Sequence, residues 1–373
     1  MGKEHPLDSI VVGANQTEAY LPLLKNKKVG IIGNQTSVIF HENQYTHLVD
    51  SLLNLGVDIQ RVFSPEHGFR GTASAGESVN DQLDEKTGIP IISLYGNHYK
   101  PTAKDLEGLD ILIFDIQDVG LRFYTYLSTL HYVMEAAAEH KIPLLLLDRP
   151  NPNGSYIDGP ILEKEHRSFV GMHPVPVVHG MTMGEYAQMI NGEKWLKNGV
   201  QCALTIIPVK NYNKNKPYSL PINPSPNLPN DRAINLYPSL CFFEGTVVNA
   251  GRGTSFQFQA FGAPSLRKDY FDFQYTPKPN AGATHPKHEN EVCYGRDLRQ
   301  TETLDHINLD WLIEAYQHTD DPQHFFNNFF EKLAGTTTLR KQIEKGMNSD
   351  QIRETWKAGL KKYDEKRQAY LLY

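Results

Sequence analysis

The sequence has few cysteines and no block of charge of one sign. Its 373 residues include 3 cysteines (Cys202, Cys241 and Cys293), which lie far apart without Cys-x-x-Cys spacing. That pattern excludes a disulfide framework and a cysteine zinc site, and it allows one disulfide at most. Lys plus Arg number 37 against 43 Asp plus Glu, for a net charge of −6. Because no window is strongly basic, we expect no nucleic-acid partner.

Long apolar runs and nucleotide-binding motifs are also missing. No run of about 18 apolar residues exists, so no membrane span is predicted. The start, Met1–Pro6, lacks the apolar core of a signal peptide, a pattern that a trimmed leader also produces. The turn Gly33–Ser37 replaces G-x-G-x-x-G, and no phosphate-loop, HExxH or G-x-S-x-G motif occurs. His285 and His288 form a His-x-x-His pair in a proline-rich stretch typical of a solvated loop. We therefore predict neither cofactor nor metal.

The length predicts two domains. Hydrophobic residues make up 40% and charged residues 21% of the chain, as in ordinary globular proteins. Because single cores stop growing at about 250 to 300 residues, 373 residues favour two domains. The segment Asn211–Pro229 is dense in Asn and Pro, which is typical of a linker. We place the domains at 1–225 and 226–373.

The first half alternates strand-like and helix-like segments. The predicted strands are Lys28–Ile32, Ile59–Phe63, Pro90–Leu94, Leu109–Phe114, Ile142–Leu147 and Val175–Val178, and the predicted helices are Leu48–Leu55, Tyr126–His140 and Thr182–Leu196. Strands so continuously apolar are buried on both faces, as in parallel sheets. The alternation predicts an α/β fold with a doubly wound parallel sheet.

Polar residues follow every predicted strand. In chain order they are Asn34 and Gln35; Glu66 and His67; Tyr95 and Asn97; Asp115, Gln117, Asp118 and Arg122; Asp148, Arg149, Asn151 and Asn153; and His179. Ligands of open α/β sheets bind outside the carboxyl ends of the strands. Six polar strand ends in succession therefore predict a binding or catalytic site at this edge.

The densest of these strand ends is Ser64–Gly71. It places Glu66, His67 and Arg70 between a proline and Gly71, so an acid, a base and an anion binder lie within five positions. Glycine and proline allow the tight path by which backbone approaches a ligand. The alternative is a structural turn in which Glu66 and Arg70 pair at the surface.

Asp115 and Asp118 invite a second alternative, a site for a hard cation. Two carboxylates three residues apart are weak evidence for a metal, so we favour binding of ligand hydroxyls or positioning of Arg122. Carboxylates, amides, arginines and tyrosines suit a polyhydroxylated, anionic small molecule.

The second half opens with Phe243–Thr246 and Gly251–Thr254. Glu244 and Arg252 are expected to face the first domain across a cleft, or alternatively to pair with each other. Farther on, apolar residues at helical spacing around Trp311 and Phe326 predict core helices, and Ile352–Tyr370 predicts a charged amphipathic helix.

These motifs resemble those of the NamZ-like exo-β-N-acetylmuramidases, a family long known as a bacterial domain of unknown function. The matching stretches are Ser64–Gly71, Asp115–Tyr126, Asp148–Pro152, His179–Thr182, Ser225–Pro229, Phe243–Thr246, Gly251–Thr254 and Leu333–Thr336. They span nearly the whole chain. The resemblance implies a Rossmann-like domain, a smaller α+β domain and a site in the cleft between them. It also implies release of N-acetylmuramic acid from the non-reducing ends of peptidoglycan fragments, in a periplasmic or secreted protein. We expect the protein to be a monomer or weak dimer.

Glycoside hydrolysis usually requires a protonated carboxylic acid and a second carboxylate. We predict Glu66 as the acid. The second group is open between Asp115, Asp118 and Glu244, with His67 as a proton carrier. Muramic acid carries a lactyl carboxylate, for which Arg70, Arg122, Arg149 and Arg252 are candidates. The remaining candidate substrate-binding residues are Asn34, Tyr124, Asp148, Asn151, His179 and Asn227.

Two other functions fit the same residues. One is a sugar- or muropeptide-binding protein without catalysis. The other is a lyase or amidase that acts on the same fragments.

Overall fold

A computed structural model describes residues 9–42, 44–66, 68–70 and 82–373 of the chain. In this part the first domain is built on a seven-stranded sheet of order β5-β6-β4-β1-β7-β8-β9. All neighbours pair in parallel except the edge strand β5. The strands are β1 (Lys28–Gly33), β4 (Asp58–Ser64), β5 (Gln82–Leu83), β6 (Pro90–Ser93), β7 (Ile111–Asp115), β8 (Leu144–Leu147) and β9 (Leu204–Ile207). The predicted α/β class with a parallel sheet is confirmed.

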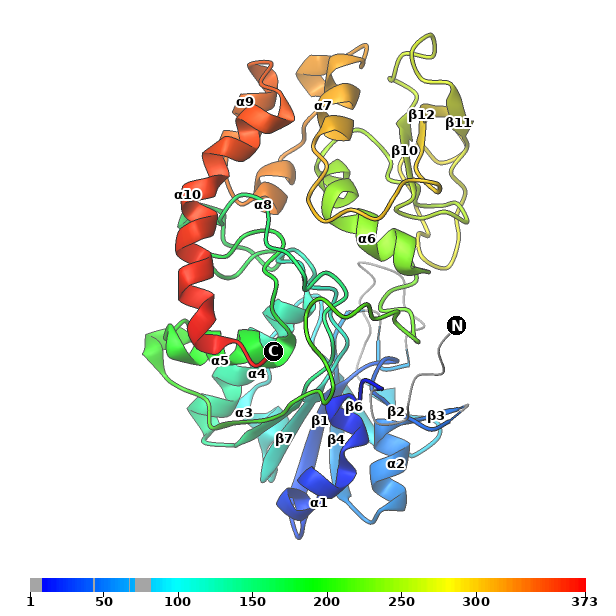
Figure 1. Ribbon diagram of the computed structural model, residues 1–373. Helices are drawn as coiled ribbons and strands as arrows, with labels where there is room; N and C mark the ends of the chain where they lie inside the picture. The colour runs from blue at the N-terminus through cyan, green and yellow to red at the C-terminus, as the bar shows by residue number, and fades with distance from the viewer. Residues whose placement is uncertain (1–8, 43, 67, 71–81) are drawn as a thin grey trace.

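Alternate side chains of each strand enter different hydrophobic cores. In β8, Leu144 and Leu146 join a cluster with α4 (Tyr126–His140) and α5 (Met183–Gly192), whereas Leu145 and Leu147 join a cluster with α1 (Thr17–Leu24) and α2 (Leu48–Asn54). Successive strand residues point to opposite faces, so each face carries its own helices. Figure 1 shows α1 and α2 separated from α3 (Ala103–Leu106), α4 and α5 by the sheet.

The prediction of a strand at Val175–Val178 is wrong. This segment is fully buried, but Val178 makes only isolated bridges, to Leu121 and Asp158. The strand beside β8 is β9, three of whose four residues are not buried. An apolar run predicts that a segment is buried but not that it pairs as a strand. Here a buried loop has the apolar composition expected of a buried strand.

The second domain has a three-stranded antiparallel sheet of order β10-β12-β11 and five helices. These elements are β10 (Ala260–Ala263), β11 (Phe273–Tyr275), β12 (Cys293–Asp297), α6 (Asp231–Leu240), α7 (Asp310–Gln317), α8 (Phe330–Ala334), α9 (Thr338–Glu344) and α10 (Ser349–Arg367). The first domain also contains a hairpin of β2 (Val38–Phe40) and β3 (Tyr45–His47). Residues 211–230 contain no helix or strand, which agrees with the loop expected there.

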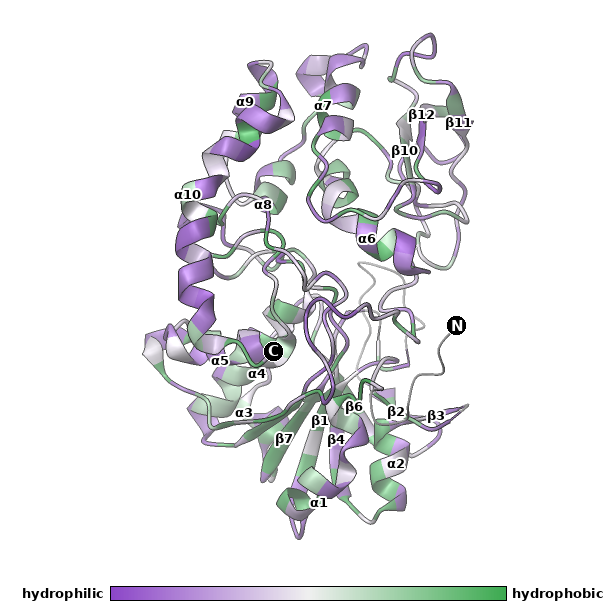
Figure 2. Ribbon diagram, in the orientation of Figure 1, coloured by the Kyte–Doolittle hydropathy of each residue, from purple (hydrophilic) through white to green (hydrophobic). Residues whose placement is uncertain are grey.

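Helix α10 runs back to the first domain, as Figure 1 shows in red. Its surface is largely hydrophilic, in contrast to strands β1 and β7 (Figure 2), while Trp356 and Tyr363 are buried. The hydroxyl of Tyr363 donates to the carbonyl of His179 at 2.7 Å, and the Tyr373 hydroxyl donates to Asp148 at 2.9 Å. The last helix therefore fastens the two domains together.

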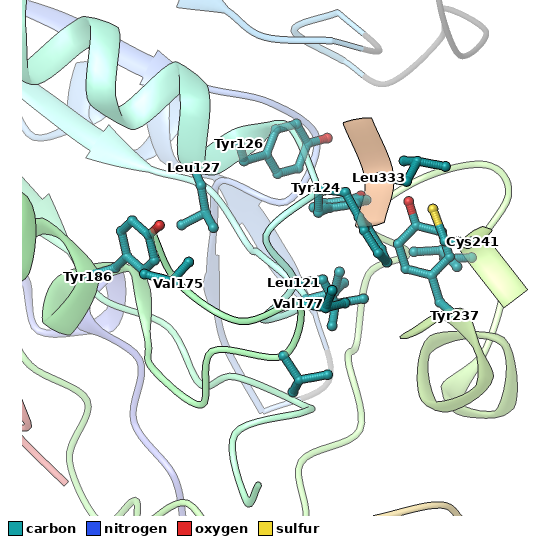
Figure 3. Close-up of a cluster of buried hydrophobic side chains, with 14 of the residues drawn as sticks. Leu121, Tyr124, Tyr126, Leu127, Val175, Val177, Tyr186, Tyr237, Cys241 and Leu333 are labelled. Carbon is teal, nitrogen blue, oxygen red and sulfur yellow. The ribbon is translucent and has the colours of Figure 1, made fainter. Parts of the chain in front are cut away.

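One continuous core joins the two domains. Tyr237, Cys241 and Leu333 of the second domain share a cluster with Leu121 and Tyr124 of the first (Figure 3). The rings of Tyr124 and Tyr237 meet edge to face at 6.0 Å. This packing makes the boundary between the two domains part of the hydrophobic core.

Candidate active site

A pocket of about 70 Å³ lies where the two domains meet. The first domain lines it with Glu66, Phe123, Tyr124, Thr125 and Tyr126, the connecting segment with Ser225, Asn227 and Leu228, and the second domain with Tyr237, Arg252 and Phe258. Of the predicted site residues, the structure brings Glu66, Tyr124, Asn227 and Arg252 together here. Such a mixture of aromatic walls and a few polar groups is typical of a small-molecule site.

Glu66 follows β4, at the carboxyl edge of the sheet. Its Oε2 accepts a hydrogen bond of 2.8 Å from the hydroxyl of Thr125, the residue that precedes α4. A second hydrogen bond joins it to Tyr95; burial and the Glu66 charge together raise the pKa of that phenol. Two hydroxyls from two other strand ends thus orient this carboxyl group. His67 and Gly71 lie outside the described residues.

Arg252 faces Glu66 from the second domain. Its Nε lies 3.1 Å from Glu244 Oε1, and its guanidinium lies 5.5 Å from the centre of the Phe258 ring. Burial lowers the pKa of Arg252, but the charges of Glu244 and Glu66 outweigh burial and raise it. Of the two residues expected at a cleft, Arg252 lines the pocket and Glu244 does not, and the two form the alternative pair. A guanidinium in this position is suited to a ligand carboxylate.

Lys287 holds the loop that carries Glu244. Its ammonium group donates to the carbonyls of Phe243 and Thr246 at 2.8 Å, and to those of Glu244 and Val248 at 3.2 Å. Four carbonyls around one cation fix the backbone path. Glu244 is therefore presented on a rigid loop.

Asn227 contributes an acceptor to the pocket. Its Nδ2 donates to the carbonyl of Gly282 at 2.6 Å, whereas its buried Oδ1 has no hydrogen-bond partner among the described residues. Beside it, the hydroxyls of Tyr124 and Tyr126 both donate to the carbonyl of Pro224, at 3.0 and 3.2 Å. The connecting segment is thereby tied to the first domain and closes one side of the pocket.

Comparisons with known proteins agree with this architecture. Residues 29–232 match the family "Exo-beta-N-acetylmuramidase NamZ, N-terminal", and residues 235–373 match the corresponding C-terminal family. The chain belongs to the NamZ family. It is 37% identical over 374 residues to the peptidoglycan β-N-acetylmuramidase NamZ of Bacillus subtilis. The aligned region covers 95% of this chain and 89% of that protein.

Two solved structures from Bacteroides fragilis resemble this NamZ-family protein throughout. Both are described as DUF1343 family proteins. One is 46% identical with a TM-score of 0.90, covering 98% of this chain and 99% of the other. The second is 26% identical with a TM-score of 0.81, covering 99% and 100%.

Other predicted site residues lie outside the pocket lining. Asp115 is fully buried and forms a two-pronged pair with Arg149, whose Nε and Nη2 donate to it at 2.6 and 2.9 Å. Arg149 also donates to the carbonyl of Val38 at 2.9 Å. Burial raises the pKa of Asp115 against the effect of Arg149. The two predicted site residues therefore satisfy each other inside the core and lie outside the pocket lining.

Arg122, a predicted carboxylate ligand, also lies outside the pocket lining. Only 1% of the residue is exposed, and its guanidinium donates to the carbonyls of Pro160, Val175, Leu333 and Ala334 at 2.7 to 2.9 Å. Burial lowers its pKa to about 9. Arg122 binds the first domain to α8 of the second.

Arg70 makes its contacts within the first domain. It pairs with Asp84 at 2.8 Å and with Asp50 at 3.4 Å, and it lies over the ring of Phe69. The alternative of a surface pair with Glu66 is therefore replaced by a clamp on two other carboxylates. Arg70 positions the chain that follows Glu66.

Four further candidates support the pocket from behind or stabilise the core. Asn34 is buried and donates to the hydroxyl of Tyr126 at 3.0 Å. Asp148 accepts from Thr182 at 2.7 Å and from the backbone of Gly184 at 2.9 Å. Asn151 donates to the carbonyl of Met181, and His179 accepts from the backbone of Met181. Burial raises the pKa of Asp148 to about 6 and lowers that of His179 to about 3.

Asp118 is the remaining buried carboxylate near the pocket. Its Oδ2 accepts from the backbone of Gly120 at 2.7 Å, and its Oδ1 has no hydrogen-bond partner in the part of the chain that the structure describes. Burial raises its pKa to about 7, and its charge acts on the pocket residues Tyr124 and Tyr126.

Sequence reasoning missed several pocket residues, namely Phe123, Thr125, Tyr126, Ser225, Leu228, Tyr237 and Phe258. The run Phe123–Tyr126 carried a usable signal, since three aromatic rings around the start of a helix are unusual after a strand end. Tyr237 and Phe258 carried none, because aromatic residues in a second domain look like core. No cluster of three metal-binding side chains occurs within the described residues.

Proposed function

We propose that this protein is an exo-β-N-acetylmuramidase that releases N-acetylmuramic acid from the non-reducing end of peptidoglycan fragments, with Glu66 as its general acid. The observation that carries the proposal is the carboxyl group of Glu66, held by Thr125 and Tyr95 at the pocket and opposed by Arg252. Membership of the NamZ family supports the reaction class.

Each polar pocket group matches a part of muramic acid. Arg252 offers a cation for the lactyl carboxylate, and Glu244 is its partner within the protein. Asn227 Oδ1, which has no hydrogen-bond partner among the described residues, is suited to accept from the N–H of the 2-acetamido group. The aromatic walls of Phe123 and Tyr237 exclude water from the reacting carbon.

The reaction then balances with one water. Glu66 transfers its proton to the glycosidic oxygen as the bond from that oxygen to C1 of muramic acid breaks, and the leaving sugar departs as an alcohol. Water attacks C1 and gives up a proton to a second carboxylate. With Asp115 committed to Arg149, the groups left for that role are Asp118 and Glu244.

The connecting segment supports cleavage from the non-reducing end of the glycan. Tyr124 and Tyr126 bind Pro224, and Ser225, Asn227 and Leu228 line the adjoining wall. A wall on one side of the pocket admits a terminal sugar and blocks a continuing glycan strand.

Product mass tests the proposal. The purified protein is incubated with the disaccharide N-acetylmuramyl-β-1,4-N-acetylglucosamine. We expect two free monosaccharides whose summed mass exceeds that of the substrate by one water. Equal mass would indicate elimination. A disaccharide that stays intact would indicate a binding protein, or an amidase if the same disaccharide carrying a stem peptide loses that peptide.

We further propose a periplasmic or secreted location, where peptidoglycan is found, and a monomer or weak dimer. The large exposed apolar side chains, such as Tyr45, Leu83 and Val292, are scattered along the described chain. No described helix is long and apolar enough to cross a membrane. Cell fractionation and sedimentation equilibrium test the two statements.

A further inference from the structure

A group of four aromatic rings lies beside Glu66, and the reaction above uses only one of them, Tyr95. Tyr99 stacks on Phe169 with ring centres 4.1 Å apart, and Tyr132 lies stacked at 6.2 Å from Tyr99. Tyr95 meets Tyr99 edge to face at 6.3 Å. We call these four residues the aromatic platform.

The platform is not part of the core. Each of its four residues is partly exposed, and none belongs to the hydrophobic clusters found among the described residues. Contiguous apolar groups at a protein surface mark interaction sites or ligand-binding grooves.

Its surroundings hold the platform rigid. Lys100, next to Tyr99, bonds Glu135 and Glu139 at 2.7 Å. The hydroxyl of Ser128 donates to the carbonyl of Phe169 at 2.6 Å. A surface fixed by its own ion pairs loses little entropy when a ligand binds.

Glu66 connects the platform to the pocket. Thr125, which bonds one side of the carboxyl group, lines the pocket, whereas Tyr95, which also bonds it, belongs to the platform. A general acid must reach the oxygen that joins the two sugars. With the muramic acid in the pocket, the leaving sugar therefore extends toward Tyr95.

We propose that the aromatic platform binds the glycan on the leaving-group side, by stacking on the apolar C–H faces of its N-acetylglucosamine-containing chain. This inference rests on the proposed function for its direction along the glycan. Aromatic rings offer sugars a large apolar face, and the phenols of the three tyrosines add hydrogen-bonding edges. The protein then favours oligomeric glycans over a muraminide with a small aglycone.

The test compares two substrates in the same variant. One is the nitrophenyl β-muraminide, and the other is the peptide-free tetrasaccharide of two alternating muramyl-glucosaminyl units. In Tyr99→Leu, which keeps apolar bulk without a ring, the ratio of KM for the tetrasaccharide to KM for the nitrophenyl substrate should rise about tenfold. Tyr99→Phe, which keeps the ring, should restore the ratio.

Tyr270 provides the matched control, because it is 42% exposed and stacks on His318 at 3.5 Å in the second domain. Tyr270→Leu should leave the ratio at the wild-type value. An unchanged ratio in Tyr99→Leu overturns the proposal. The proposal is also overturned if the KM ratio rises only when the tetrasaccharide is replaced by fragments that carry stem peptides, because the platform would then bind peptide.

A binding experiment separates this proposal from the proposed function. A β-1,4-linked N-acetylglucosamine tetramer, which contains no muramic acid, is titrated into the wild type and into Tyr99→Leu by calorimetry. Binding to the wild type that weakens about tenfold in the variant supports the platform even if no muraminide is cleaved. Absence of binding to the wild type, with muraminides still cleaved, overturns the platform alone.

Discussion

The hydroxyl of Thr125 donates a hydrogen bond to Glu66 and does not cap its own helix. The residue occupies the N-cap position of α4, yet its side chain makes no capping hydrogen bond and donates to Glu66 Oε2 at 2.8 Å. Threonine at an N-cap normally satisfies a free backbone N–H of the first turn. The helix gives up that contribution, and the carboxyl group gains a fixed orientation.

Replacing Thr125 separates these two roles. Thr125→Val keeps the shape of the side chain but removes the donor, so kcat/KM should fall about tenfold. Thermal stability should change little, because no capping bond is lost. A clear drop in melting temperature with full activity per folded molecule would show that the hydroxyl serves the helix after all.

Glu66→Gln tests the general acid directly. Glutamine keeps the size and hydrogen-bonding reach but delivers no proton, so kcat should fall by roughly 10²- to 10⁴-fold with the fold intact. A nitrophenolate leaves without much protonation, and the deficit should therefore be small on a nitrophenyl muraminide and large on the natural disaccharide. Equal losses on both substrates, or this pattern in Asp118→Asn instead, would move the acid elsewhere.

Arg252 should decide selectivity for muramic acid. In Arg252→Met the lactyl carboxylate loses its partner, and the preference in kcat/KM for a muraminide over the matching glucosaminide should fall by about 30-fold or more. The control is Arg296→Met, which breaks an ion pair with Glu314 away from the pocket lining. Equal activity of the wild type on both sugars would remove the basis for this role.

Asp115 is expected to matter for folding and not for chemistry. Asp115→Asn leaves the buried Arg149 without its counter-charge, a loss of about 3 to 5 kcal/mol in unfolding free energy. Denaturant titration measures it. The exposed pair of Asp269 and Arg267 offers a comparison, and Asp269→Asn should leave the melting temperature unchanged. Asp115→Asn with wild-type stability and a lost rate would return Asp115 to the active site.

Acid should destabilise the protein through buried histidines such as His179. Burial lowers its folded pKa to about 3, with the positive charges of Arg367, Lys214 and Arg122 adding to the effect. Because the folded pKa lies below the unfolded value, the contribution is complete above about pH 6.5 and is lost as the pH falls toward 3.

His179→Asn removes this titration and keeps an acceptor for the Met181 amide. Between pH 7.5 and pH 5, the unfolding free energy of the wild type should therefore fall by about 1 to 2 kcal/mol more than that of the variant. Denaturant titrations at the two pH values measure the difference. Parallel decreases in both proteins would assign acid sensitivity to other groups.

Local sequence patterns predicted the sheet well. Continuous apolar runs identified β1, β4, β6, β7 and β8, and the glycine after α2 ends that helix with a positive φ of 78° at Gly56. These features depend on neighbouring residues only. The run at Val175–Val178 misled because burial and strand pairing select the same side chains.

The candidate site was predicted only in part, for a geometric reason. Polar residues at parallel strand ends all reach the same edge, but one step along the chain turns a side chain from the pocket into the core. Glu66 and Tyr124 face the pocket, whereas Asp115 and Arg149 face each other. Equal composition at each strand end hides this difference.

The sequence by itself determined the α/β class, the edge of the sheet that carries the polar groups, and the family motifs. Only the tertiary structure decided which charges are available to a ligand. Arg122 and Arg252 are both arginines in family motifs, yet one donates to four backbone carbonyls and the other lines the pocket. A buried cation must find hydrogen-bond acceptors among the groups packed around it. For Arg122 these acceptors are the carbonyls of residues 160, 175, 333 and 334, which lie far from residue 122 in the sequence.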